Sequence, residues 1–135
     1  MQDDATSRDG VYIEEAVHEI YRQLSEGNDP ETVPFKTMKD IFMWAASLGY
    51  RMGERRPLTG QRVMIFRWAQ FSNQVDVPLI KGMAISDSSQ VGILVSQNNI
   101  LTAVEEYANA GIHELRASLM DEHGQPLWNL NGLLT

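Results

Sequence analysis

Four apolar residues near the start of the chain recur at helical spacing. They are separated by four, three and four positions: Ile13, Val17, Ile20 and Leu24. Side chains at such positions share one face of an α-helix. Most residues between them are polar, so the opposite face of the helix would meet water. The pattern predicts an amphipathic helix that ends near Gly27, with Asp9 as its candidate N-cap.

A second and more apolar helix is predicted from Thr37 to Leu48. The Thr37 side chain can accept a hydrogen bond from the amide three residues on, and Asp40 can reach back, as in a capping box. Apolar residues cover most of the helix circumference: Met38, Ile41, Phe42, Met43, Trp44, Ala45, Ala46 and Leu48. A helix of this kind is typical of a protein core. Gly49 is the residue expected to end it.

The pattern is less regular in the middle of the chain. Residues 61–71 favour a short strand or an irregular segment, because their β-branched and aromatic residues do not alternate cleanly with polar ones. Asp76 is the expected cap of a helix over residues 77–86. A turn is predicted at residues 87–90, and a short apolar run follows at residues 91–95.

The last third of the chain returns to helical spacing. Ser96 is the expected cap of a helix that stops near Gly111, and a further short helix is predicted over residues 112–119. The end of the chain, residues 127–134, is too apolar to remain in water. It is expected either to fold back over the core, which is the favoured interpretation, or to dock on another subunit.

These elements predict a mainly α, compact single-domain helical fold, with a short strand or hairpin around residues 62–68. A disordered acidic leader is expected at residues 1–9 and one globular helical domain at residues 10–135. The chain has no Cys, which excludes disulfides and thiolate metal sites. It has no apolar run of the roughly 20 residues that a membrane-spanning helix needs. We therefore expect a cytoplasmic protein without a membrane partner.

Positive charge is concentrated in one window of an acidic protein. Residues 36–67 hold seven of the eleven Lys and Arg residues and only two acids, a net charge of +5. The remaining residues hold four cations and sixteen acids, a net charge of −12, and the whole chain carries −7. Such a window is a candidate surface for a polyanion or for an acidic region of a protein. Its members are Lys36, Lys39, Arg51, Arg55, Arg56, Arg62 and Arg67.

The alternative to a binding surface is that these cations pair with carboxylates of the same protein. We weigh intrachain or protein-partner pairing above direct contact with DNA, because a net charge of −7 repels phosphate except where the basic window faces it. A candidate secondary contact patch is formed by Glu105, Glu106 and Tyr107, where a carboxylate could meet an Arg of the window.

No catalytic, cofactor-binding or metal-binding residue is predicted. Adjacent helical residues point about 100° apart, so Glu105 and Glu106 cannot both face one metal ion. The three histidines lack metal-ligand spacing, and the run from Asp121 to His123 is more typical of a solvated turn. Glycine-rich phosphate-binding motifs and the nucleophile motif of hydrolases are absent from the sequence.

Three segments together resemble a known family. They are FKTMKDIFMWAASLGYRMGERRPL (Phe35–Leu58), IFRW (Ile65–Trp68) and EEYANAGIHEL (Glu105–Leu115). They resemble dnd-system-associated protein 4, a family of small accessory proteins of DNA phosphorothioation clusters, over residues 30–134. The resemblance implies a prokaryotic system that marks its own DNA with sulphur and attacks unmarked DNA. It also implies that sulphur transfer belongs to larger neighbouring proteins.

The leading hypothesis is a non-enzymatic accessory or adaptor protein of a DNA phosphorothioation-linked modification-restriction system used in antiviral defence. It would act through contacts with other proteins of that system. Contacts of the DNA backbone with the Arg-rich loop predicted at residues 50–60 are a possible addition, and a homo-oligomer is left open. One alternative is a DNA-binding transcriptional regulator that reads DNA with the helix from Thr37 to Leu48. Another is a metal-dependent nuclease or hydrolase that uses Glu105, Glu106, Asp121 or His123.

Overall fold

The computed structural model describes residues 8–88, 96–121 and 123–134 of the 135-residue chain. The elements are β1 (Gly10–Glu14), α1 (His18–Ser25), α2 (Met38–Met52), β2 (Arg62–Arg67), α3 (Asp76–Ser88), α4 (Gln97–Met120) and α5 (Pro126–Leu134), with 3₁₀ turns at Glu15–Val17 and Trp68–Gln70. The mainly helical single-domain fold with a strand near residues 62–68 is thus confirmed. Within the described residues, no helix is both long enough and apolar enough to cross a membrane.

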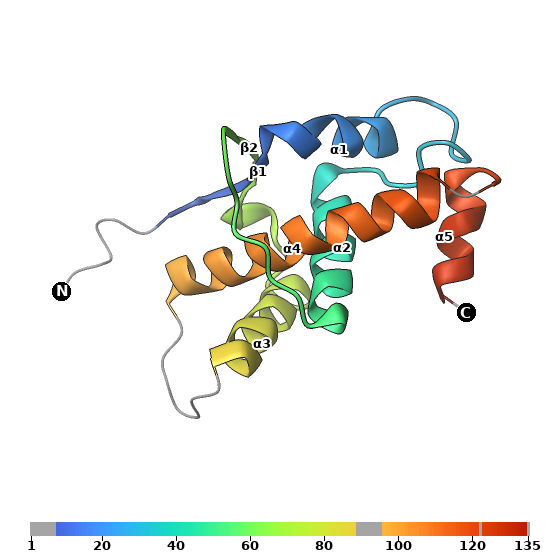
Figure 1. Cartoon of the computed structure of the whole chain (residues 1–135). Coiled ribbons are helices and arrows are strands. Elements are labelled where there is room, and N and C mark those ends of the chain that lie inside the picture. The colour runs from blue at the N-terminus through green and yellow to red at the C-terminus, as the bar shows by residue number, and fades with distance from the viewer. Residues whose placement is uncertain (1–7, 89–95, 122, 135) are drawn as a thin grey trace.

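Helices α2 and α4 cross at the centre of the molecule, and the other elements surround this crossing (Figure 1). Their closest approach is made by two glycines. A methyl group at Gly49 would overlap the carbonyl oxygen of Tyr107, and one at Gly111 would overlap the carbonyl oxygen of Ala45. Only glycine therefore allows the two backbones to lie this close.

The expectation that Gly49 and Gly111 end helices is wrong. Helix α2 continues to Met52 and ends at Gly53, whose φ of 68° is the left-handed conformation of a helix C-cap. Helix α4 runs without interruption from Gln97 to Met120, so the separate helix expected at residues 112–119 is part of it. The physical reason is that a glycine inside a helix can serve interhelical packing, and sequence alone does not distinguish this role from termination.

The expected Thr37 and Ser96 hydroxyl caps of α2 and α4 are present. The Thr37 hydroxyl accepts from the Asp40 amide at 3.2 Å, and the Ser96 hydroxyl accepts from the Asn99 amide at 3.1 Å. Helix α3 differs slightly from the expectation, because Asp76 is its first residue. The preceding turn is capped by Ser72, whose hydroxyl accepts from the Asp76 amide at 3.0 Å.

The start of the first predicted helix is instead a strand. Residues Gly10–Glu14 form β1, which pairs antiparallel with β2, and only residues from His18 onward are α-helical. Val11 and Ile13 are both buried, so the apolar residues here follow the period of a strand. Pairing with β2 overrides the helical spacing of Ile13 and Val17. Asp9 therefore does not cap a helix, and its backbone oxygen accepts from the Trp68 amide at 2.8 Å.

Helix α5 follows a turn after α4 and runs crosswise at the C-terminal end of α4, against which it packs (Figure 1). Leu130 is buried in the core, whereas Trp128 is 58% exposed. The Trp128 indole donates to the Glu31 carboxylate at 2.6 Å, and the Leu127 amide donates to the Glu31 carbonyl at 3.0 Å. The apolar C-terminal segment thus lies on its own domain, as favoured from the sequence.

Two predictions fall largely outside the described residues. They are the acidic leader, of which residues 1–7 are not described, and the turn and apolar run, of which residues 89–95 are not described. The expected turn at residues 87–90 begins inside α3, which extends to Ser88. Arg8 at the end of the leader is bonded to α4 through its backbone amide, which donates to the Asn98 side chain at 2.7 Å.

Candidate functional site

A row of hollows follows the solvent-facing side of α2. The first has a volume of about 430 Å³, the second about 240 Å³ and the third about 410 Å³. The apolar residues of their floor come from α2 and from the segment just before it, and α5 contributes a wall to the first and third hollows. These residues are Phe35, Met43, Trp44, Leu48, Met52, Leu130 and Leu133. We call this row the α2 groove.

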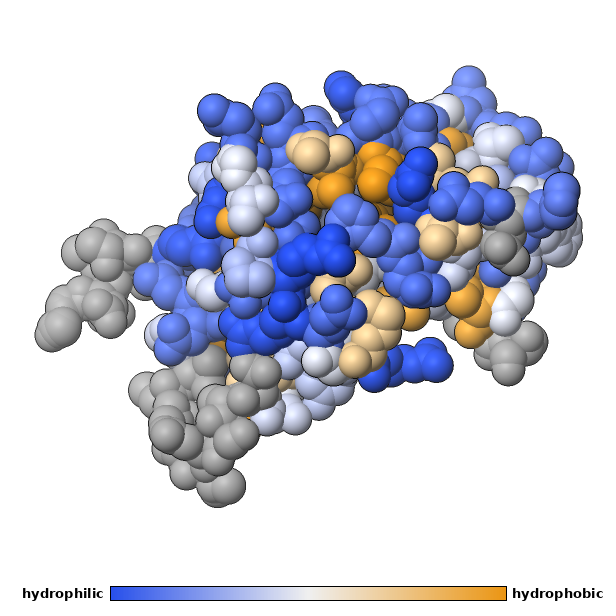
Figure 2. Space-filling view, in the orientation of Figure 1, coloured by the Kyte–Doolittle hydropathy of each residue, from blue (hydrophilic) through white to orange (hydrophobic). Residues whose placement is uncertain are grey.

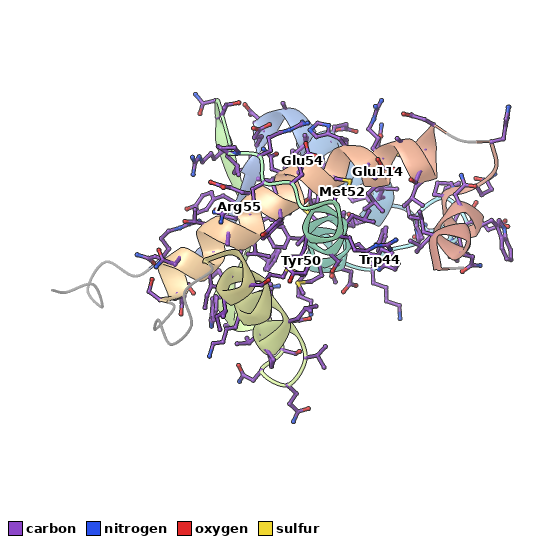
Figure 3. All side chains as sticks on the ribbon, turned by 60° about the horizontal axis from the view of Figure 1, so that its bottom comes forward. Trp44, Tyr50, Met52, Glu54, Arg55 and Glu114 are labelled. Atoms are coloured by element: carbon purple, nitrogen blue, oxygen red, sulfur yellow. The ribbon has the colours of Figure 1, made fainter. Side chains whose placement is uncertain are left out.

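The spacing of residues on α2 explains why the three hollows follow one side of the helix. Trp44, Leu48 and Met52 are each four positions apart and therefore lie above one another along the helix. Trp44 and Leu48 are half-buried, and Met52 is 43% exposed. Figure 3 shows Trp44 and Met52 on the side of α2 that faces α5, with Glu114 beside Met52. This partly exposed apolar strip is a candidate interaction site.

Charged residues stand at both ends of the groove. Lys36 and Asp40 line the hollow near the start of α2. Arg51 and Glu114 line the hollow near its end. Ser47, which is half-buried, lines the central hollow. A hydrophobic groove is one kind of surface to which amphipathic helices of partner proteins bind.

Three of the seven cations predicted as contact residues are in ion pairs within the chain. Lys39 lies 2.8 Å from Asp76, Arg55 lies 2.9 Å from Glu106, and Arg67 lies 2.9 Å from Asp9. Partial burial raises the pKa of Asp76, but the Lys39 ammonium and the Ser72 amide outweigh it and hold that pKa below its usual value. Intrachain pairing therefore accounts for part of the basic window.

The other four cations are exposed, and among the residues that the structure describes none of them forms an ion pair: Lys36, Arg51, Arg56 and Arg62. They do not form one patch. Lys36 and Arg51 lie at the two ends of the α2 groove, whereas Arg56 belongs to the loop that crosses α4 and Arg62 begins β2. On the face shown in Figure 2, the most hydrophilic side chains gather near the middle, where Figure 1 shows this loop in front of α4.

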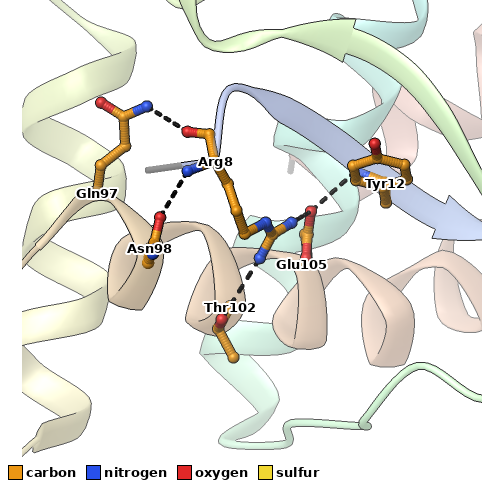
Figure 4. A network of polar contacts seen from close by, with 6 residues as sticks. All are labelled: Arg8, Tyr12, Gln97, Asn98, Thr102 and Glu105. Carbon is orange, nitrogen blue, oxygen red and sulfur yellow. Dashed lines mark hydrogen bonds and ion pairs between the residues drawn. The ribbon is translucent and has the colours of Figure 1, made fainter. Parts of the chain in front are cut away.

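Glu105 is a buried carboxylate with two strong partners. It is 3% exposed, lies 2.5 Å from the Arg8 guanidinium, and accepts from the Tyr12 amide at 2.8 Å (Figure 4). Burial raises the pKa of the Glu105 carboxyl, and the Tyr12 amide and Arg8 offset this only in part. Glu105 thus joins the N-terminal strand to α4. It was predicted as part of a contact patch, but its buried carboxylate holds two segments of the chain together.

The neighbouring residues of that patch also face other parts of the chain. Glu106 pairs with Arg55 and its carbonyl accepts from the Arg56 amide at 3.0 Å. Tyr107 is buried and makes an edge-to-face contact with Tyr50 at a centroid distance of 5.4 Å. The patch and the Arg-rich loop are thus brought together, and their contacts hold the loop on α4.

A second polar cluster lies one turn further along α4. Asn109 donates to the Glu14 carboxylate at 3.1 Å and to the Arg56 carbonyl at 3.0 Å. Partial burial raises the pKa of Glu14, but bonds from Thr59 and Asn109 outweigh it and lower that pKa. Burial and the Arg56 charge lower the pKa of His113, although the Glu14 charge opposes them. No local pattern in the sequence predicts this cluster, because its residues come from distant segments.

No group of three or more acidic or histidine side chains suited to a metal ion occurs in the part of the chain that the structure describes. Glu122, which belongs to the run from Asp121 to His123, lies outside that part.

Most of the chain matches the model of one protein family. The model of one family, described as DNA sulphur modification system-associated protein 4, matches residues 11–132. The chain belongs to this family. The resemblance in the three segments is thereby confirmed, and the match adds the N-terminal strand to the region covered. No curated protein and no solved structure matches the chain.

Membership in the family associates the protein with a DNA sulphur modification system, which has other components. The α2 groove was not predicted as a site. From the sequence, its apolar residues are predicted to lie in the core, because α2 is apolar nearly all round. The available signal is that α2 is apolar nearly all round, whereas it packs mainly on one element, α4, with fewer contacts to α1 and β2.

Proposed function

We propose that this protein is a non-enzymatic accessory or adaptor protein of a DNA phosphorothioation-linked modification-restriction system that acts in antiviral defence. It binds another protein of that system, which inserts an amphipathic helix into the α2 groove. Family membership supports the assignment to the system. The observation that carries the mode of action is the exposed apolar floor of the groove, formed by Trp44, Leu48 and Met52.

The size of the groove fits one helix of a partner. Helix α2 has 15 residues, which corresponds to about 22 Å at 1.5 Å per residue. A partner helix of about four turns would cover the three hollows. Two methionines, Met43 and Met52, line it, and their flexible side chains adapt to the shape of a docked helix.

The test is capture of partners by a tagged version of the full chain in its native host. Ser47→Arg places a long charged side chain in the central hollow, where the half-exposed position lets the charge reach water. We expect this variant to lose at least 90% of the captured component of the sulphur modification system. Mass spectrometry after nuclease treatment gives the readout, and the treatment removes partners held only through DNA.

Gln23→Arg is the matched control, because it adds the same charge at an exposed position of α1, away from the groove. It should capture as much partner as the unmodified protein. Thermal unfolding of both variants checks that they fold. Equal capture by Ser47→Arg and the control would contradict a partner in the groove, and the absence of any system component would contradict the adaptor function.

A second candidate activity is contact with the DNA backbone. It is favoured by Arg56 and Arg62, which are exposed and lack ion pairs among the described residues. Phosphate contacts of this kind position a protein on DNA without reading its sequence. Arg55 is a poor probe of this activity, because Arg55→Glu would place a carboxylate against Glu106.

The informative variant is therefore Arg56→Glu with Arg62→Glu. If these residues contact DNA, we expect weaker binding to duplexes of any sequence and a salt dependence reduced by about two phosphate contacts, a slope change of about 1.8. Fluorescence anisotropy with a labelled duplex at several salt concentrations measures both effects. Lys81→Glu, an exposed change on α3, is the control. Unchanged affinity and slope would exclude this surface.

A further inference from the structure

A separate hollow lies where α5 packs against the C-terminal end of α4 (Figure 1). It has a volume of about 600 Å³, and we call it the α4–α5 pocket. Glu114 and Ser118 line it from α4, and Trp128 and Gly132 line it from α5. The pocket shares Glu114 with the third hollow of the α2 groove, whereas the first two hollows of the groove are lined by other residues.

Trp128 gives the pocket an exposed aromatic ring in a fixed position. The side chain is 58% exposed, and its indole N–H donates to the Glu31 carboxylate at 2.6 Å. The same segment is held again by the Leu127 amide, which donates to the Glu31 carbonyl at 3.0 Å. A carboxylate that accepts from the indole N–H increases the electron density of the ring. The exposed face of Trp128 therefore attracts a cation.

The charge that lines the pocket is negative. The Glu114 carboxylate accepts from the Ser118 hydroxyl at 3.3 Å and forms no ion pair among the described residues. No Lys or Arg is found among the described residues that line the pocket. Arg51 shares the neighbouring hollow with Glu114 without pairing to it, and Arg116 on the same part of α4 lies 3.7 Å from Asp121. An indole ring and a carboxylate thus face one cavity that has no lysine or arginine in its described lining.

The walls of the pocket are held in place by contacts that a ligand would not have to form. The Asn129 side chain donates to the Leu119 carbonyl at 3.0 Å and joins α5 to the end of α4. Leu130 on the opposite side of α5 is buried in the core. A methyl group added at Gly132 would meet no atom within 4 Å, so this position leaves space in the pocket. Groups fixed before binding lose little conformational entropy when a ligand arrives.

We propose that the α4–α5 pocket binds the guanidinium group of an arginine residue of a partner protein. The planar guanidinium stacks on the Trp128 indole and donates to the Glu114 carboxylate, a combination that suits arginine because it is both flat and permanently charged. An anionic ligand is disfavoured, since Glu114 and Glu31 would repel it. The site goes beyond the proposed function, because it needs no helix in the α2 groove.

A capped amino acid tests the site on the full-length protein. The probe is Nα-acetyl-arginine amide, and its control is Nα-acetyl-citrulline amide, which has nearly the same shape and no charge. NMR signals of the indole N–H groups are followed during titration at pH 8, where histidine side chains such as that of His123 in the lining are uncharged. We expect the Trp128 signal to shift with a Kd on the order of 1 mM for the arginine probe, at least about fivefold tighter than for citrulline. The Trp44 signal, from the α2 groove, should remain in place.

Two variants show which groups bind the probe. Glu114→Gln keeps an acceptor for the Ser118 hydroxyl and removes the charge, so the preference for arginine over citrulline should fall to less than about twofold. Glu15→Gln makes the same change at an exposed position outside the pocket and should leave the preference intact. Trp128→Leu should abolish binding of the arginine probe, measured through the backbone amide signals of α4 and α5. Thermal unfolding checks that each variant is folded.

Several outcomes would overturn the proposal. They are equal affinities of the arginine and citrulline probes, an arginine preference that survives in Glu114→Gln, and an unmoved Trp128 signal at about 50 mM arginine probe. The result is independent of partner capture. Ser47→Arg, which obstructs the α2 groove, should leave the arginine preference unchanged, so either proposal can fail while the other stands.

Discussion

Gly111→Ala is expected to prevent formation of the native helix crossing. The added methyl group would overlap the carbonyl oxygen of Ala45 and crowd the amide nitrogen of Gly49. Both are backbone atoms inside a helix, so relief requires α2 and α4 to move apart and to lose the packing between them. We expect a loss of more than about 3 kcal/mol in the free energy of unfolding, which lowers the melting temperature by about 10 °C or more.

Thermal and urea unfolding followed by circular dichroism measure this effect. Gly82→Ala is the matched control, because Gly82 also lies inside a helix, yet an added methyl group there meets no atom within 4 Å. At this position the higher helix propensity of alanine is expected to leave stability unchanged or to raise it by about 0.5 kcal/mol. Equal stability of Gly111→Ala and Gly82→Ala would show that the helices do not cross as closely as described.

Arg8→Gln is expected to destabilise the protein at neutral pH by about 2 kcal/mol and much less in acid. At neutral pH it leaves the buried Glu105 carboxylate without its cation. Breaking a buried pair costs about 3–5 kcal/mol, and the figure is reduced here because Arg8 is 29% exposed. When the carboxyl is protonated, the charge that Arg8 compensates is absent.

The sign of the pH dependence follows from the raised pKa of Glu105. A carboxyl whose pKa is higher in the folded than in the unfolded protein contributes stability that is fully present below the unfolded value of 4.5 and is lost as pH rises through the folded value. Arg8 limits this loss, and its removal raises the folded pKa further. The difference between the Arg8→Gln protein and the unmodified protein should therefore grow from pH 4 upward.

Urea unfolding at pH 4 and pH 7.5 measures this growth. Arg22→Gln is the control, since Arg22 pairs with Glu19 on the surface, where both side chains are about half exposed. It should change stability little at either pH. A loss in Arg8→Gln that is the same at both pH values would contradict the assigned role of the Arg8–Glu105 pair.

Local signals in the sequence were sufficient for much of the fold. The caps at Thr37 and Ser96 fixed where α2 and α4 begin, because a side-chain oxygen that satisfies an unpaired amide acts within three residues. The family segments and the basic window were also visible without coordinates. These properties depend on neighbouring residues or on residue content, and both can be read from the amino-acid sequence.

Only the tertiary structure decided the roles of several residues. Gly49 and Gly111 serve a crossing between segments some sixty residues apart, and Val11 and Ile13 form a strand because β2 pairs with them. The partners of Lys39 and Arg55, and the solvent exposure of one side of α2, depend equally on distant segments. The sequence by itself determined which residues are apolar, charged or capping. Which of them meet was determined by packing between elements, because contacts across long separations leave no local pattern.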